Sequence, residues 1–233
     1  PFCSSVILIS AVGGYPLGAF TARRLFEQSE ISSADFKKLL LFAVLPSPSF
    51  AVGAVGSAML GSKNAGFLIY FSVLLASLIL GIFSRLTVFK DTDSTFSSEA
   101  PNCRYEIFSS ISSSIEKSGR AMLFICFSIL FFSAVLSITD SFFASASAQM
   151  LSAALLEVTC GCKRLSENFA LPVIAGTVGW GGLCTHFQIM NEISLSGLST
   201  PVFFAFRLLH GALSSVFCLA LLKIFPVASE TLS

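Results

Sequence analysis

The stretch Ala65–Ser84, AGFLIYFSVLLASLILGIFS, contains no Asp, Glu, Lys or Arg. About 20 apolar residues are enough for an α-helix to cross a bilayer. Ala121–Thr139, AMLFICFSILFFSAVLSIT, has the same character and is rich in Phe and Ile. These two stretches predict transmembrane helices, and they place the chain in the class of all-α membrane proteins.

The composition of the whole chain agrees with this class. Of its 233 residues, 54% are hydrophobic and 12% are charged, whereas a soluble domain has about 25% charged residues. A net charge of +1, with no basic run longer than two residues, excludes a nucleic-acid-binding surface. We therefore predict a polytopic helical bundle, multi-pass in a cell membrane. Stretches free of Asp, Glu, Lys and Arg cover 1–22, 39–62, 65–84, 121–139, 141–156, 168–191 and 208–222.

The chain begins at Pro1, inside an apolar stretch with no basic segment ahead of it. A secretory signal peptide starts with a positively charged segment. We therefore expect that an N-terminal portion of the protein precedes this fragment.

Three apolar stretches contain residues that interrupt an α-helix. The interruptions are Gly13-Gly14-Tyr15-Pro16-Leu17-Gly18, Pro46-Ser47-Pro48 and Gly179-Trp180-Gly181-Gly182. Proline removes a backbone donor, and glycine weakens a helix. Non-helical backbone at membrane depth occurs only where protein or water satisfies it, and secondary transporters build their solute sites from such broken helices. Ordinary kinked helices are the simpler alternative, but three interruptions favour a bundle with two broken or re-entrant hairpin repeats.

The first and third interruptions resemble each other. When Gly14-Tyr15-Pro16 is laid on Gly179-Trp180-Gly181, the same register lays Glu27 on Glu192. Each half then contains a broken hairpin, a polar elbow and a long helix. This layout predicts an internally duplicated transporter.

The basic residues predict the orientation in the membrane. Suppose that both hairpins are re-entrant and that 141–156 spans the membrane. Eleven of the fourteen Lys and Arg then lie on one side of the membrane, with Lys63 and Lys223 on the opposite side. If 141–156 instead lies along the membrane surface, ten Lys and Arg lie on one side and three on the other, and the two repeats have opposite orientations in the membrane. The positive-inside rule makes the basic face cytoplasmic, which puts the loop around 90–117 inside the cell. The construction of known transporters favours inversion.

Ionisable side chains at membrane depth are costly, so each is a candidate site residue. Arg207, His210, Ser214 and Cys218 share one face at helical spacing. This polar stripe suits an anionic solute or a hydrogen bond inside the bundle. Arg207 could equally extend its charge to the near membrane interface.

Three further polar residues lie close to interruptions or helix ends. His186 and Gln188 follow the third interruption, where His186 could carry a proton or bond to a neighbouring helix. Glu157 is either a helix-end carboxylate in water or a buried partner of Arg207.

The half-helices that follow Gly14 and Gly179 would present free N–H groups, which attract carboxylates and phosphates. An anion is therefore the physically preferred solute. Cys160 and Cys162 have no partners spaced for a metal site, and no motif of a hydrolase or P-loop enzyme occurs. We predict a binding protein with no catalytic residue, metal or cofactor. The candidate binding residues are Gly14, Tyr15, Pro16, Gly18, Ser47, Glu157, Gly179, Trp180, Gly181, His186, Gln188, Arg207 and His210.

Four motifs in order resemble one known family. They are Gly14-Tyr15-Pro16-Leu17-Gly18-Ala19, Leu156-Glu157-Val158-Thr159-Cys160-Gly161, the stretch from Gly179 to Gln188, and Arg207-Leu208-Leu209-His210-Gly211. Together they resemble the sporulation integral membrane protein YlbJ (SpoVV) family, whose members carry nucleoside-recognition Gate domains. The resemblance covers nearly the whole chain and is weakest around 90–117. Where the family tends to have two Asn before a Ser-Pro, this chain has Val44-Leu45 before Pro46.

The resemblance implies an architecture similar to concentrative nucleoside transporters. It implies one transmembrane domain over 1–233, with Gate-like repeats at 1–89 and 119–233 joined by a hydrophilic loop and surface helix at 90–118. It also implies transport of a small anion, with dipicolinic acid at the outer forespore membrane as the example in that family. The alternatives are a nucleoside-transporter-like permease and a non-transporting scaffold for spore maturation. The expected partners are the anion, the lipid bilayer and further copies of the chain.

Overall fold

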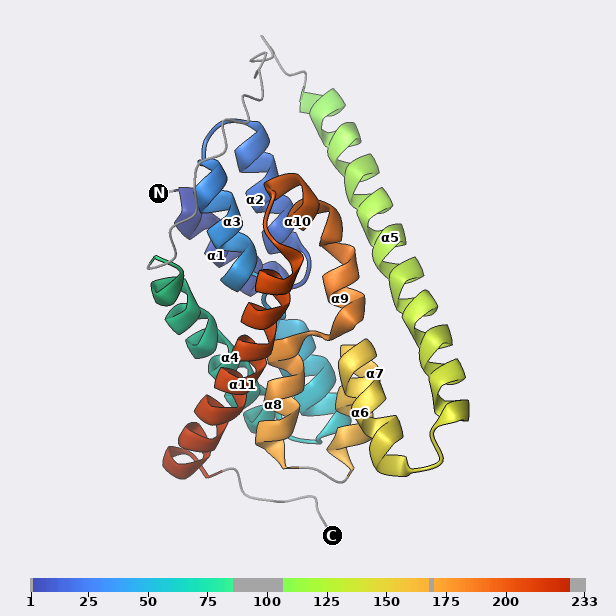
Figure 1. The fold of residues 1–233 in the computed structure, drawn as a ribbon. Helices are drawn as coiled ribbons and strands as arrows, with labels where there is room; N and C mark the ends of the chain where they lie inside the picture. Colours follow the sequence, from blue (N-terminus) through green and yellow to red (C-terminus); the bar gives the residue numbers. More distant parts are fainter. Residues whose placement is uncertain (1, 86–106, 168–169, 227–233) are drawn as a thin grey trace.

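The computed structural model describes residues 2–85, 107–167 and 170–226, and no β-strand occurs among them. Figure 1 shows a single bundle of helices with α5 along its edge. The elements are α1 (Phe2–Gly13), α2 (Leu17–Glu27), α3 (Ser33–Phe42), the π-helix η1 (Ser49–Met59), α4 (Lys63–Ser84), α5 (Ile107–Phe142), α6 (Ala146–Leu156), α7 (Val158–Ser166), α8 (Leu171–Trp180), α9 (Gly182–Gln188), α10 (Met190–Ser196) and α11 (Thr200–Ile224).

Three helices in the described residues are long and apolar enough to cross a membrane. They are α4, the part of α5 from Ile111 to Phe142, and α11, with 22, 32 and 25 residues. At 1.5 Å per residue these are roughly 33, 48 and 37 Å long, against about 30 Å of hydrocarbon. Leu78, Leu130 and Leu208 are exposed on their outer faces, as expected for surfaces that contact lipid. The all-helical class is confirmed, and the three helices are compatible with a membrane protein.

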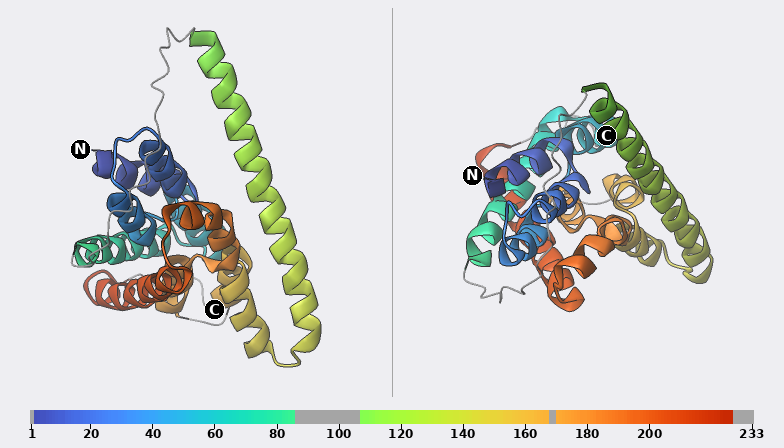
Figure 2. Two further views of the ribbon diagram at one scale, coloured as in Figure 1. Left: turned by 45° about the horizontal axis from the view of Figure 1, so that its top comes forward. Right: turned by 90° about the horizontal axis from the view of Figure 1, so that it is seen from above.

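α5 is one continuous helix, so the surface helix expected at the end of the segment 90–118 is not a separate element. Its sequence contains no proline and only Gly119 as a glycine. An ion pair between Arg120 Nη2 and Glu116 Oε1, 2.9 Å long, lies across the expected boundary and supports helical continuity. Figure 2 shows the helix standing beside the rest of the bundle. Most of the hydrophilic loop expected before it, residues 90–106, lies outside the described residues.

The stretch 141–156 does not form a spanning helix. α6 has 11 residues, or roughly 17 Å of helix, and the chain turns at Glu157 into α7. The two helices pack closely, because Gly161 faces Ala154 with no room for a side chain between them: an ideal Cβ on Gly161 would lie 2.5 Å from Ala154 Cα. α6 and α7 are therefore a tight pair of short helices rather than a crossing.

Two successions of elements have the same order. The helix pair α1–α2, the interrupted helix α3–η1 and the long helix α4 are followed later by α6–α7, α8–α9 and α11. In Figure 1 the first interrupted helix runs from top to bottom and the second from bottom to top.

The register of this correspondence differs from the one that the sequence predicted. The order of elements lays the α1–α2 pair on the α6–α7 pair, and not on α8–α9 as the match of Gly14 with Gly179 requires. That match would also place Pro46 on Gly211, in the middle of α11, which is unbroken.

The hydrophobic core joins the two successions. One cluster combines Phe36 and Leu40 of α3 with Ile193 of α10 and Phe203 of α11. A second combines residues of η1 and α4 with residues of α7, α8 and α11, including Cys218. Neither half of the chain therefore buries its apolar surface without the other.

Candidate functional site

The first interrupted helix is opened by its two prolines. In a continuous helix, the carbonyl of residue i accepts from the N–H of residue i+4. Pro46 and Pro48 have no N–H, so the carbonyls of Phe42 and Val44 lose their helical donors. Because buried backbone groups are almost always paired, other donors must reach this segment.

Side chains from three other helices donate to the carbonyls of Phe42, Ala43 and Val44. Ser77 of α4 donates to the Phe42 carbonyl at 2.8 Å, and Ser10 of α1 donates to the Ala43 carbonyl at 2.5 Å. Nη1 of Arg207, in α11, donates to the Val44 carbonyl at 2.9 Å. The interruption predicted at Pro46-Ser47-Pro48 is thus real, and its carbonyls are bonded within the bundle.

The second interrupted helix opens at Gly181, which ends α8 in the left-handed conformation with φ of 87°. This turn frees the last carbonyls of α8. Nη2 of Arg207 donates to the carbonyls of Gly179 at 2.5 Å and Trp180 at 3.0 Å, and its Nε lies 3.3 Å from the Trp180 carbonyl. One guanidinium therefore joins the carbonyl ends of α3 and α8.

Arg207 is fully buried, at 0% exposure, so its side chain does not extend to the membrane interface. Among the described residues it forms no ion pair with a carboxylate. Its partners are helix C-terminal carbonyls, which carry the partial negative charge of the helix dipole. The charge is balanced by backbone dipoles of both interrupted helices.

The turn between α1 and α2 also reaches this junction. Gly14 has φ of 81°, and an ideal Cβ there would lie 2.7 Å from the backbone nitrogen of Ser47. The hydroxyl of Tyr15, ahead of a cis bond to Pro16, donates to the Val178 carbonyl of α8. The two predicted interruptions at 14–18 and 179–182 therefore approach each other inside the bundle.

His186 and Trp180 form the aromatic wall of the junction. Nε2 of His186 lies 2.8 Å from the Trp180 carbonyl, and the two rings meet edge to face with centroids 4.3 Å apart. The indole N–H of Trp180 donates to the Leu155 carbonyl of α6 at 3.2 Å. Phe203 and Phe204 also pack edge to face on the His186 ring. Trp180 thus ties the second interrupted helix to the α6–α7 pair.

Glu157 is buried but is not a partner of Arg207. Its Oε1 accepts from the N–H of Thr159 at 3.0 Å and its Oε2 accepts from the N–H of Cys160 at 2.7 Å. The carboxylate therefore caps the first turn of α7, where the helix dipole favours a negative charge. Gly182 packs against this turn, because an ideal Cβ on it would lie 2.9 Å from the Val158 nitrogen.

Three further predicted site residues form contacts with other parts of the bundle. Gly18 packs against Ser10 and the Ala43 carbonyl. The amide of Gln188 lies 3.6 Å from the sulfur of Cys184, and Nε2 of His210 lies 3.1 Å from the Val73 carbonyl of α4. The polar stripe of α11 is therefore used, at least at His210, for bonds inside the bundle.

Sequence reasoning missed an ion pair between α2 and α10, in which the Glu192 side chain is buried and the Arg23 side chain is 35% exposed. Oε1 of Glu192, in α10, lies 3.3 Å from Nη1 of Arg23, in α2, and Glu192 is 3% exposed. Its Oε2 has no partner among the described residues, and the same holds for Nδ1 of His186 and of His210. A signal was present, because Glu192 is an acidic residue in a long stretch that is otherwise apolar.

No group of three His, Cys, Asp or Glu side chains in the described residues could hold a metal ion. The chain matches no family model, no curated protein and no solved structure. The feature of the structure that bears on function is the junction itself, in which the carbonyl ends of two antiparallel interrupted helices hold a buried guanidinium.

Proposed function

We propose that this protein is a membrane transporter of a small anionic solute. The observation that carries the proposal is Arg207, a fully buried charge without a carboxylate partner in the described residues, at the crossing of two interrupted helices. A charge in such a place is expensive and marks a functional site by default.

The order of the elements supports a transporter. Two short helix pairs, each followed by an interrupted helix and a long helix, are interpreted as inverted repeats with re-entrant hairpins α1–α2 and α6–α7. Transporters of this kind bind their solute where the interrupted helices meet. The interpretation agrees with the resemblance to the YlbJ family and to concentrative nucleoside transporters.

The partners of Arg207 favour an anion as the solute. Neutral carbonyls accept its N–H groups at distances of 2.5 to 3.3 Å. A carboxylate that pairs with a guanidinium adds the attraction between two full charges and can accept two parallel N–H groups, which a single carbonyl cannot do. A solute carboxylate would therefore replace carbonyl acceptors at Arg207 and release the two interrupted helices from each other.

Arg207 also occupies the kind of position that a coupling cation takes in other transporters. Unwound carbonyls and helix C-terminal ends coordinate Na⁺ there, whereas in this chain a tethered guanidinium fills the carbonyl cluster. We infer that anion uptake does not require Na⁺.

A planar dicarboxylate such as dipicolinate suits the rest of the junction. One carboxylate would bind Arg207. The ring would lie against Tyr15, whose side chain meets the guanidinium at Gly181, or against Trp180, whose carbonyl accepts from Arg207. The YlbJ resemblance points to the same solute, in the context of spore formation.

Uptake by the purified chain in proteoliposomes tests the proposal, with radiolabelled dipicolinate and uridine compared in Na⁺ and in choline buffers. We expect dipicolinate uptake in both buffers. Arg207→Gln should weaken dipicolinate binding by roughly ten- to a hundredfold, since a charge-assisted contact contributes about 1.5–3 kcal/mol. Arg207→Lys, which keeps the charge, should retain part of the binding, and thermal unfolding shows whether each variant is folded.

The alternatives give different results. Uridine uptake that is insensitive to Arg207→Gln would favour a nucleoside permease and reduce Arg207 to a structural role. A folded wild-type protein that binds and moves neither solute would favour a non-transporting scaffold.

A further inference from the structure

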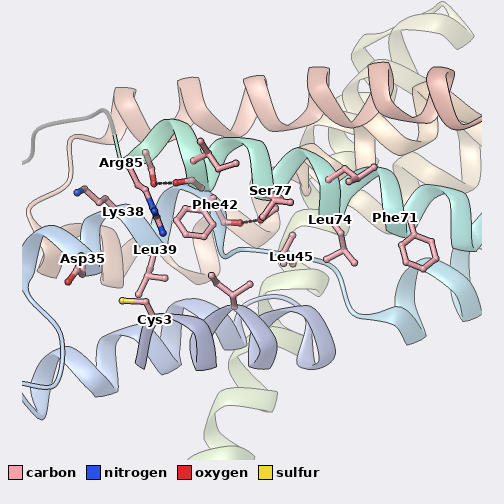
Figure 3. Close-up of a pocket in the computed structure, with 16 residues that line it drawn as sticks. Cys3, Asp35, Lys38, Leu39, Phe42, Leu45, Phe71, Leu74, Ser77 and Arg85 are labelled. Carbon is pink, nitrogen blue, oxygen red and sulfur yellow. Dashed lines mark hydrogen bonds between the residues drawn. The ribbon is translucent and has the colours of Figure 1, made fainter. Parts of the chain in front are cut away.

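A long groove lies on the bundle between α1, α3 and α4, and Arg207 is not among its lining residues. It encloses about 610 Å³. Figure 3 shows its lining residues extending along α4 from Arg85 at one end to Phe71 at the other. At the rise of an α-helix, this path from Phe71 to Arg85 is roughly 21 Å long.

The two ends of the groove differ in chemistry. Asp35, Lys38 and Arg85 border one end, and Figure 3 shows all three there. Neither Lys38 nor Arg85 forms an ion pair with another described residue. Two cations and one carboxylate leave an excess of one positive charge at this end.

The rest of the groove is apolar. Phe42, Leu74 and Leu78 are typical of its walls. The Ser77 hydroxyl is already bonded to the Phe42 carbonyl at 2.8 Å, so it offers no donor to an occupant. A ligand that fits this surface has a negatively charged head and a long hydrocarbon tail.

We propose that this groove binds an anionic phospholipid, with its phosphate at Lys38 and Arg85 and an acyl chain along α4 towards Phe71. The length agrees, because one leaflet with its headgroups is about 20–22 Å thick, half of a bilayer of about 40–45 Å. The orientation agrees as well, since Lys38 and Arg85 belong to the basic face assigned to the cytoplasm, where anionic lipids attract Lys and Arg.

The lipid would also contact the first interrupted helix. Leu45 lines the groove, and its neighbour Val44 is the residue whose carbonyl binds Arg207. An acyl chain in the groove therefore packs directly on the segment that holds the guanidinium.

The test uses the full chain in detergent, with phosphatidylglycerol, phosphatidylcholine or phosphatidylethanolamine added. Bound lipid is counted by native mass spectrometry, and thermal unfolding is followed in parallel. We expect phosphatidylglycerol to be retained and to raise the unfolding temperature, and the other two lipids to do so much less. The double variant Lys38→Gln, Arg85→Gln should bind phosphatidylglycerol about thirtyfold more weakly, at about 1 kcal/mol for each cation.

Two further variants separate the groove from general charge and from folding. Lys63→Gln with Lys223→Gln removes the same charge on the opposite face and should leave phosphatidylglycerol binding unchanged. Leu78→Trp, at a lining residue that is 62% exposed, should fill the groove and reduce retention while leaving both cations in place. Equal binding of the three lipids, or equal losses in the two double variants, would overturn the proposal.

Discussion

Replacing Tyr15 by Phe probes the contact between the two interruptions with the smallest possible change. The Tyr15 hydroxyl donates to the carbonyl of Val178, which is distant in the sequence, and its ring lies beside Gly181, with an ideal Cβ there 3.6 Å from the ring. Phenylalanine keeps the ring and removes only the hydroxyl. Packing is preserved, so the effect reports on the polar contacts of the hydroxyl, which are the bond to Val178 and the interaction with Arg207.

The expected loss of stability follows from that bond. A buried hydrogen bond contributes about 0.5–1.5 kcal/mol, and a buried acceptor left without its donor costs about 1–3 kcal/mol. We expect Tyr15→Phe to lower the free energy of unfolding by about 1–3 kcal/mol. Tyr70→Phe is a matched control, because the Tyr70 hydroxyl donates to the Ala11 carbonyl at 2.8 Å, also between distant residues.

The assay is reversible unfolding in mixed micelles, together with dipicolinate uptake by the same preparations. Both variants should lose stability, but only Tyr15→Phe should also reduce uptake, because Tyr15 borders Arg207. An unchanged unfolding free energy for Tyr15→Phe would refute the bond between the α1–α2 turn and α8. Equal losses of uptake in both variants would show that stability alone, and not the junction, accounts for the effect.

Three other predictions concern backbone strain, helix capping and topology. Gly14→Ala should lower the unfolding free energy by at least about 1–2 kcal/mol, because its φ of 81° is unfavourable for an L side chain; Gly119→Ala, with nothing within 4 Å, should not. Glu157→Gln leaves one acceptor for two N–H groups at the start of α7 and should cost about 1–2 kcal/mol in the same measurement; an unchanged value would return Glu157 to the list of solute ligands. A cysteine at Ser112, in a background without the native cysteines, should react with a membrane-impermeant reagent only from the cytoplasmic side, and labelling of intact cells would reverse the orientation.

Some of this structure follows directly from the sequence. Runs such as Ala65–Ser84 determine the helical class, since apolar length is a local property. The interruptions at Pro46-Ser47-Pro48 and at Gly181 are equally local, because proline lacks an N–H and glycine tolerates a positive φ. The chain need not fold before these features can be recognised.

Other features depended on the partners that folding supplies. The turn at Glu157 contains neither glycine nor proline, and α6 ends there because the carboxylate of Glu157 caps the next helix. The register that aligns Gly14 with Gly179 was based on similar residue types at the two interruptions. The order of the packed elements instead aligns α1–α2 with α6–α7.

The role of Arg207 shows the division between sequence and tertiary structure most clearly. Sequence alone identified it as an expensive charge in an apolar helix and left open a solute ligand, an internal bond or an extension to the interface. Only the fold brings the carbonyls of Val44 and Gly179, which lie in different halves of the chain, to one guanidinium. Apolar runs and helix-breaking residues affect the structure of their own segment, so their effects can be predicted from the sequence. The partner of a buried charge is set by which helices pack together, and that is decided by the whole core at once.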